Sequence, residues 1–295
     1  MKREYIIPPS CGGMTVRDYV RGTLELSASC FKKAKYSGGI LLDGTPVTAR
    51  HILEAGSVLT IVIPDTASDG IVSADLPINV LYEDEDILAV DKKAGMPVHP
   101  SVRHYDDTLA NAVMYYYRKR GVPFTFRVLT RLDIDTTGVV LIAKNAAAAG
   151  KFAACSPEKT YFAVTVGCPT PKAGEINAPI ARDEGIMKRK IDASGKPSLT
   201  RYETLCTENG LSLVRCTPVT GRTHQIRVHL SHIDCPLYGD YLYGTEIPSE
   251  RTRLHCSCVS FVHPMTGKDM RIVSPLPDDC AKLFTDTELL NNMCQ

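Results

Sequence analysis

Short apolar and β-branched segments recur from Leu76 onward, and they constrain the fold more than any other feature of the chain. Residues 78–92 predict two strands around an acidic turn, Glu83–Asp86, and residues 106–120 predict a helix. Further strands are predicted at residues 139–145, 159–167, 198–206, 211–217, 254–262 and 269–273, with a hairpin framed by 174–180 and 187–191. Because strands dominate without regular βαβ alternation, we predict an α+β fold with a mixed, mostly antiparallel sheet.

The first 65 residues predict a smaller unit. Residues 27–36 predict a helix with Ser27 or Ser29 at its N-cap. Asp43-Gly44 between two apolar runs predicts a tight hairpin, and the β-branched run after Gly56 predicts a strand. A helix, a hairpin and a strand in this order resemble the S4 fold, a small α/β module that binds RNA.

Three lysines on that predicted helix are the first candidate RNA contacts. The S4 resemblance implies that Lys32, Lys33 and Lys35 touch phosphates, whereas an ordinary solvated helix face is the alternative. Residues 66–75 are small and polar and predict a linker. The expected organisation is therefore an S4-like domain at 1–65, a linker at 66–75 and a larger domain at 76–295.

Charge and composition exclude several classes of protein. The formal net charge is only +1, which by itself argues mildly against a nucleic-acid binder, so local basic clusters have to carry that function. Eleven cysteines occur without any C-x-x-C pair, which makes a metal site improbable. The sequence shows neither an apolar run of about 20 residues nor an N-terminal secretion signal, so we expect a cytoplasmic protein without a membrane partner.

The segment RLDIDTTG, residues 131–138, places an arginine and two aspartates before the buried strand VVLIAKN. Alone, such a motif carries little information, because most isolated aspartates are solvated turn residues. Other blocks accompany it in a fixed order: LYEDEDILAVDKKAGMPVHPS, EKTYFAVTVG, TPVTGRTHQIRVHLSHIDCPLYGD and LHCSCVSFVHPMTGKDMRIVSPLPDD. From about residue 76 to 280, these blocks resemble the RluA-type pseudouridine synthases, which modify RNA.

Two positions depart from the family pattern. Thr130 stands where the family usually has histidine, and Lys93 stands where it usually has proline. Neither change replaces the catalytic acid. Thr130 is expected to alter how the loop grips RNA, and Lys93 to loosen the turn before Gly95.

The resemblance implies a mechanism with one essential carboxylate. Isomerisation of uridine moves the base from a nitrogen to a carbon linkage without redox change, so no nicotinamide, metal or other cofactor is required. By resemblance the carboxylate is Asp133, acting either as nucleophile at C1′ or as base at C2′ of the sugar. Asp135, two residues later, would point the other way in an extended loop, and we assign it no catalytic part.

The resemblance assigns further residues to the site. Arg222 is expected to pair with Asp133 and keep it ionised, with Thr223 capping the following helix. Tyr161 is expected to stack on the extruded uracil, with its hydroxyl near C5, and Arg131 to enter the RNA beside the flipped nucleotide. Additional RNA contacts are expected from a basic hairpin and from the helix that follows Thr223, namely Lys188, Arg189, His224 and Arg227.

Three alternatives remain open at this point. A non-catalytic RNA-binding or ribosome-assembly protein would have lost the aspartate or its arginine partner, and both are present. A hydrolase would need Asp133 and Asp135 to converge as an acid–base pair. The expected substrate is large-subunit ribosomal RNA, with transfer RNA as the second choice, and the expected state is a monomer.

Overall fold

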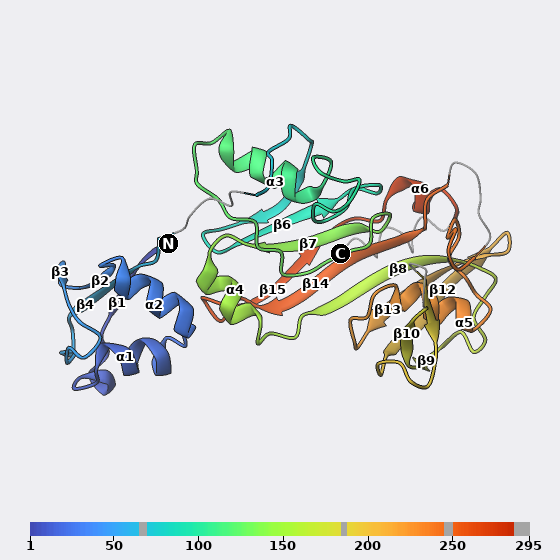
Figure 1. The fold of residues 1–295 in the computed structure, drawn as a ribbon. Coiled ribbons are helices and arrows are strands. Elements are labelled where there is room, and N and C mark those ends of the chain that lie inside the picture. The colour runs from blue at the N-terminus through green and yellow to red at the C-terminus, as the bar shows by residue number, and fades with distance from the viewer. Residues whose placement is uncertain (65–69, 184–187, 245–249, 286–295) are drawn as a thin grey trace.

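Two main β-sheets organise the chain, one in the N-terminal unit and a larger one in the rest (Figure 1). The computed structural model describes residues 1–64, 70–183, 188–244 and 250–285. None of the helices in these segments is long and apolar enough to cross a membrane.

The N-terminal unit is a four-stranded antiparallel sheet covered by short helices. Its strands are β1 (Lys2–Ile6), β2 (Ile40–Leu42), β3 (Thr45–Pro46) and β4 (Val58–Val62), in the order β1-β4-β2-β3. The helical segments are η1 (Pro9–Cys11), α1 (Val16–Asp18), the π-helical turn η2 (Tyr19–Thr23) and α2 (Ala28–Tyr36).

The local predictions for this unit are confirmed. Ser27 is the N-cap of α2, and its hydroxyl accepts a hydrogen bond of 3.2 Å from the Cys30 amide. Asp43 and Gly44 both have positive φ, 48° and 80°, as a two-residue type I′ hairpin requires. Strand β1, which pairs along the whole of β4, was not predicted from the sequence.

The large sheet has nine strands, and a single pair among them is parallel. The strands are β5 (Asn79–Glu83), β6 (Ile87–Lys92), β7 (Thr137–Ala143), β8 (Glu158–Val166), β9 (Ala173–Asn177), β12 (Leu199–Glu208), β13 (Leu211–Pro218), β14 (Leu254–Val262) and β15 (Asp269–Val273). The order is β5-β6-β7-β14-β8-β13-β12-β9, with β15 on β14. Among the strand pairs in the described part of the chain, only β7 and β14 run parallel. The predicted α+β class with a mixed, mostly antiparallel sheet is confirmed.

Four helices accompany this sheet: α3 (Leu109–Arg118), α4 (Ala146–Phe152), α5 (Gln225–His232) and α6 (Asp278–Ala281). Successive residues of β6 and β7 enter different cores. Ile87 and Val139 join the core that includes Phe152 of α4, whereas Leu88 and Val140 join the core beneath α3. Because both faces are buried, these strands are continuously apolar rather than alternating.

One predicted hairpin forms over a shorter span than expected, because only the end of its first segment pairs with the basic run. The segment GEIN forms β9, which pairs with β12, and not with the basic run that follows it. The basic run instead contributes β11 (Arg189–Ile191), which pairs with β10 (Ile180–Arg182). The residues that would form the tip, 184–187, lie outside the described part of the chain.

The N-terminal unit packs against the larger one through α4 (Figure 1). Ala147 of α4 is buried within the N-terminal core, and an added Cβ at Gly150 would lie 3.6 Å from the Cβ of Ser27. Small side chains on α4 therefore permit close approach. Arg3 of β1 also forms an ion pair with the buried carboxylate of Asp86, in the turn between β5 and β6.

A row of residues crosses the large sheet at the start of β7. Gly138 pairs with Cys256 of β14, Cys256 pairs with Tyr161 of β8, and Tyr161 pairs with Cys216 of β13. On the other side Gly138 pairs with Lys92 of β6. Gly138 has φ 110°, and an added Cβ would lie 2.1 Å from the carbonyl oxygen of Cys256, so only glycine fits here.

We therefore expect Gly138→Ala to lower the free energy of unfolding by more than about 3 kcal/mol, because backbone strain and a clash with β14 add together. Gly210→Ala is the matched control, since Gly210 has φ 75° and no atom within 4 Å of the added Cβ. It should cost only about 1 kcal/mol. Denaturant unfolding of both variants gives the measurement, and equal losses would contradict the close approach of β7 to β14.

Candidate active site

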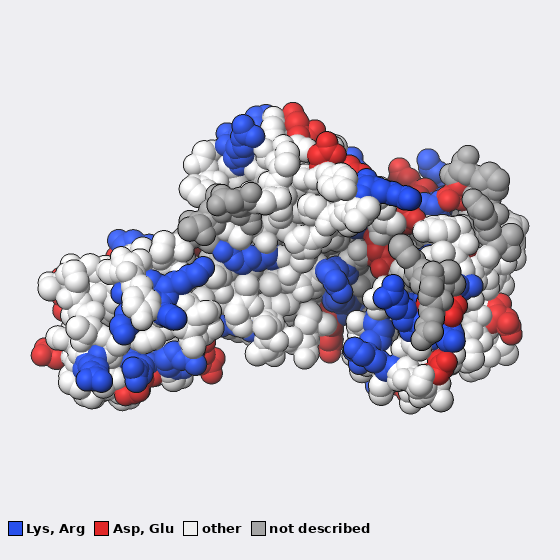
Figure 2. Space-filling view, in the orientation of Figure 1, with Lys and Arg blue, Asp and Glu red and all other residues white. Residues whose placement is uncertain are grey.

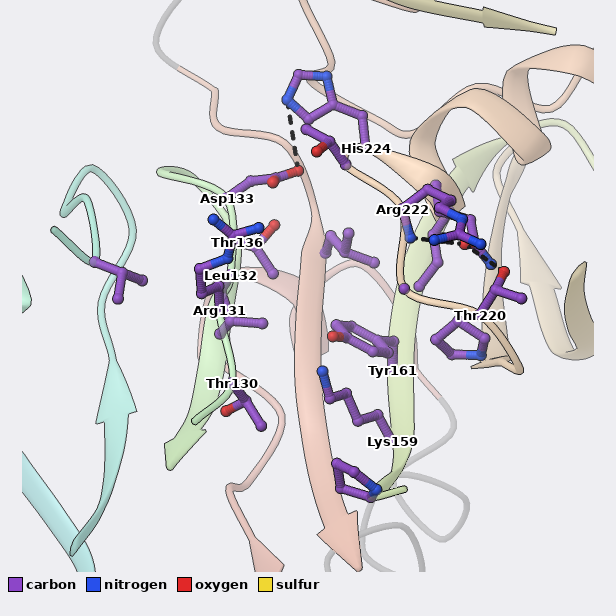
Figure 3. A pocket seen from close by; sticks show the side chains of 18 of the residues that line it. Thr130, Arg131, Leu132, Asp133, Thr136, Lys159, Tyr161, Thr220, Arg222 and His224 are labelled. Carbon is purple, nitrogen blue, oxygen red and sulfur yellow. Dashed lines mark hydrogen bonds and ion pairs between the residues drawn. The ribbon is translucent and has the colours of Figure 1, made fainter. Parts of the chain in front are cut away.

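A pocket of about 750 Å³ opens beside this row of residues (Figure 3). Three segments supply most of its lining: the loop before β7, the start of β8, and the loop leading into α5 with the first residues of that helix. Val98, His99 and Leu254 complete it. Its polar lining includes Arg131, Asp133, Lys159, Tyr161, Arg222 and His224. The tertiary fold thus brings together residues that are far apart in the sequence, from Val98 to Leu254.

Backbone contacts hold the loop that carries Asp133. Its carbonyl oxygen accepts a hydrogen bond of 3.2 Å from the Thr136 amide, which closes a tight turn. The next carbonyl, of Ile134, accepts a hydrogen bond of 2.9 Å from Nζ of Lys92. The Asp133 side chain is 28% exposed, so the carboxylate is reachable from the pocket while its backbone is restrained.

Lys92 holds this loop through hydrogen bonds of its ammonium group, and it was not predicted from the sequence as a site residue. Its ammonium also donates to the carbonyls of Lys93 and Met96, at 2.9 and 2.8 Å. Burial lowers the pKa of Lys92 to about 7, although the carboxylates of Asp135 and Asp133 act in the opposite direction. The sequence alone could not identify Lys92 as a site residue, because its distinguishing property is the burial of its charge, which only the structure reveals.

Arg227, and not Arg222, is the arginine that approaches the aspartate. Its Nη1 lies 3.5 Å from Oδ2 of Asp133. Its Nε and Nη2 donate to the two oxygens of the buried Asp240, at 2.7 and 2.8 Å. Burial disfavours the guanidinium charge, but Asp240 and then Asp133 outweigh it and raise the pKa of Arg227. Arg227, one of the expected RNA contacts, is thus a buried side chain that lines the pocket.

The expected pair between Arg222 and Asp133 does not form in the described structure. Nε of Arg222 donates to the carbonyl of Pro197 at 3.2 Å, and Figure 3 shows the side chain beside Thr220, away from Asp133. The Arg222 amide donates to the Gln225 side chain, which orders the turn before α5. Arg222 thus lines the pocket from an exposed turn, whereas α5 directs Arg227 inward.

His224 lies between these two arginines in the sequence. Its backbone is left-handed, φ 57°, and it is the N-cap residue of α5 in place of the predicted Thr223. Its Nε2 faces Asp133 at 3.8 Å, and its Nδ1 lies 2.8 Å from the hydroxyl of Tyr243. Burial lowers the pKa of His224, against the effect of Asp133, so the ring favours its neutral form.

Tyr161 projects from β8 into the pocket, as the sequence predicted. Burial raises the pKa of its hydroxyl well above the ordinary value, and the neighbouring Cys256 and Asp133 add to the shift. The phenol therefore stays protonated. Its ring belongs to the hydrophobic core behind the pocket and is among the residues that line the pocket.

The remaining pocket residues have distinct environments. Arg131 is exposed at the pocket, where it was expected. Lys159 is half-buried; burial lowers the pKa of its ammonium, Cys256 opposes this shift and Arg131 adds to it. The Thr130 hydroxyl accepts a hydrogen bond of 2.9 Å from the Leu141 amide. Thr130 thus fastens the loop to β7.

The candidate RNA contacts outside the pocket are dispersed. Lys32, Lys33 and Lys35 are exposed on α2, and Lys188 and Arg189 are half-buried on the basic hairpin. Nζ of Lys188 lies 5.5 Å from the ring centre of Tyr243. Figure 2 shows Lys and Arg side chains gathered over the N-terminal unit and again near the end of the molecule that carries α5.

One cluster outside the pocket has the composition of a metal site: Asp84, Asp86 and His263. Nδ1 of His263 accepts hydrogen bonds from the amides of Met265 and Thr266, at 3.2 and 3.0 Å. Because Nδ1 accepts, Nε2 carries a proton, and it faces Oδ2 of Asp84 at 3.0 Å. Within this cluster, the ion pair between Arg3 and Asp86 joins the two units.

Comparison with known proteins agrees with the pocket's composition. The RNA pseudouridylate synthase family matches residues 86–232. A protein of Bacillus subtilis (strain 168), named as an uncharacterised RNA pseudouridine synthase, is 35% identical over 92% of this chain and 98% of its own. The ribosomal large subunit pseudouridine synthase D of Pseudomonas aeruginosa is 36% identical over 82% of each chain.

This chain belongs to the RNA pseudouridine synthase family. The solved structure of human RNA pseudouridylate synthase domain containing 1 superposes with a TM-score of 0.61 and 27% identity, over 75% of this chain and 95% of the human one. A second human structure, of domain containing 4, has a TM-score of 0.55 at 24% identity and shares the fold. The predicted family is thereby confirmed.

The two arginines give a direct test of the geometry. Arg227→Lys keeps the charge but cannot span Asp240 and Asp133 together, so we expect kcat/KM for pseudouridine formation to fall roughly 100-fold. Arg222→Lys, the matched control, should stay within about threefold, since its guanidinium bonds only a backbone carbonyl. Steady-state kinetics with folded variants decides between them, and the reverse ranking would restore Arg222 as the partner of Asp133.

Proposed function

We propose that this enzyme isomerises uridine in large-subunit ribosomal RNA, with Asp133 as the catalytic carboxylate. The single observation that carries the proposal is an accessible carboxylate beside a buried arginine that a second carboxylate holds in place. The ribosomal substrate is supported by the name of the relative from Pseudomonas aeruginosa. Such a substrate is met in the cytoplasm, where we place the enzyme, acting as a monomer.

Asp133 suits either route to glycosidic cleavage. A carboxylate exposed to the pocket can attack C1′ or remove a proton from C2′. Nη1 of Arg227, 3.5 Å from Oδ2 of Asp133, places a positive charge beside this carboxylate. A hydrolytic pair with Asp135 is disfavoured, because Asp133 and not Asp135 lines the pocket.

Tyr161 supplies a surface for the released base. Its ring projects into the pocket from the middle of the large sheet, where stacking on uracil would hold the base while it rotates. Its raised pKa disfavours a phenolate, so we assign the ring, and not an ionised hydroxyl, the main part. We assign to Arg131, which is exposed at the pocket, the task of holding the RNA around the flipped nucleotide.

Replacing the carboxylate tests the function. Asp133→Asn keeps the shape but removes the nucleophile or base, so we expect pseudouridine formation to fall by at least about 10³-fold. Asp135→Asn is the matched control two residues away and should retain activity within about tenfold. Release of label from C5 of uridine in large-subunit ribosomal RNA provides the assay, with transfer RNA assayed in parallel.

The outcomes are distinct. An Asp133→Asn variant within tenfold of the wild type would overturn the catalytic assignment. Equal losses in both variants would favour the acid–base pair of a hydrolase. Turnover on transfer RNA but not on ribosomal RNA would keep the chemistry and replace the substrate.

We further propose that residues 1–65 form an S4-like RNA-binding domain, joined by residues 66–75 to a catalytic domain at 76–295. The three lysines of α2 are exposed, and the unit is held against the catalytic part by α4 and Arg3. A fixed unit would present phosphate contacts at a constant distance from Asp133. RNA could then be gripped at two places at once.

Replacing Lys32, Lys33 and Lys35 together by Gln should raise KM and flatten the salt dependence of RNA binding by about one unit of slope for each lost contact. The kcat should change little, because these contacts are equally strong before and during the reaction. A control that replaces the exposed Lys119, Lys172 and Lys282 by Gln changes the net charge equally. Equal effects of both triple variants would mean that α2 makes no specific contact.

A further inference from the structure

Tyr243 lies in a tight turn directly after the aspartate that holds Arg227. Oδ1 of Asp240 accepts hydrogen bonds from the amides of Leu242 and Tyr243, at 3.0 and 3.2 Å. The Ser231 hydroxyl of α5 donates to the Tyr243 carbonyl at 2.8 Å. The guanidinium of Arg227 lies 5.1 Å from the centre of the Tyr243 ring. The tyrosine is therefore held by its backbone and by its ring.

The Tyr243 hydroxyl has two neighbours with different requirements. The amide of Arg189, on β11, can only donate, and it does so at 2.7 Å. Nδ1 of His224 lies 2.8 Å away and can donate or accept according to the tautomer. Because the phenol oxygen already accepts from Arg189, its single proton is free to be donated to His224.

We infer that Tyr243 is a positioning residue that holds His224 in the tautomer with the proton on Nε2, so that this N–H faces Asp133. In this arrangement each group has a complementary partner. Arg189 donates to the tyrosine, the tyrosine donates to Nδ1, and Nε2–H points toward the carboxylate at 3.8 Å.

The opposite tautomer creates two mismatches. A proton on Nδ1 would make the phenol oxygen accept twice, which leaves its own proton without an acceptor among the described residues. Nε2 would then present a lone pair toward the Asp133 carboxylate, which is also an acceptor. A doubly protonated ring has the first mismatch as well. Of the charged groups around His224, Arg227 and Arg189 disfavour that ring, and Asp133 and Asp240 favour it.

The consequence concerns the reacting end of the pocket, and it rests on the proposed role of Asp133. An oriented Nε2–H can close on a carboxylate oxygen, or on a sugar hydroxyl beside it, when substrate fills the pocket. Tyr243 also connects β11 of the basic hairpin to this donor. A chain of polar contacts through Tyr243 and His224 would therefore connect the basic hairpin to the Asp133 carboxylate.

Nitrogen-15 NMR of the histidine side chains in the full-length protein tests the tautomer without any substrate. The signal of His224 is assigned by its disappearance in His224→Gln. We expect the wild type to show a protonated Nε2 and an unprotonated Nδ1. In Tyr243→Phe, which keeps the ring but loses the hydroxyl, the two nitrogens should become averaged or exchanged. Tyr241→Phe, at an exposed neighbour, should leave the wild-type pattern.

Kinetics complete the test. Tyr243→Phe should lower kcat by roughly 10- to 100-fold with a smaller change in KM, whereas Tyr241→Phe should change neither. Protonation of Nδ1 in the wild type, or an unchanged Nε2–H tautomer in Tyr243→Phe, would overturn the inference. An active Asp133→Asn variant alongside the expected NMR pattern would instead overturn the proposed function and leave the tautomer assignment standing.

Discussion

The buried ion pair between Arg227 and Asp240 is the interaction on which the site depends. Both side chains are almost completely buried, and two short hydrogen bonds satisfy the charges. Such a pair stabilises little by itself, but losing one partner costs about 3–5 kcal/mol because the other charge remains buried. The ion pair matters here because it positions other groups. It holds the Arg227 guanidinium beside Asp133, and Asp240 also orders the turn that carries Tyr243.

A second constraint is the close approach of β7 to β14 at Gly138. Because Gly138 has no side chain, β7 can lie close to β14 at this point. The loop before β7 therefore lies at the centre of the sheet, with β14 between it and Tyr161 of β8. Lys92, the register partner of Gly138 on β6, then reaches the carbonyl of Ile134. The loop that carries Asp133 is thus fixed by its backbone, which leaves the Asp133 carboxylate free to face the pocket.

Local pattern was sufficient for most of the elements. Apolar periodicity, capping residues and the Asp43-Gly44 turn predicted the strands of the large sheet, α2, α3 and the first hairpin, because these depend on neighbouring residues. Strand β1 and the pairing of β9 were missed. Both depend on strands far away in the sequence, β4 and β12, whose positions no local signal specifies.

The sequence by itself determined the family, the α+β class and the presence of Asp133 and Tyr161 at one site, since these follow from residue types in a fixed order. Only the tertiary structure decided which arginine serves the aspartate. Arg222 and Arg227 stand in the same block, and their roles are separated by where α5 begins and by a carboxylate thirteen residues beyond Arg227. Asp240, Tyr243 and Lys92 were also recognised as site residues only from the structure. Burial and distance determine which charges and protons must be paired, and a linear sequence contains neither.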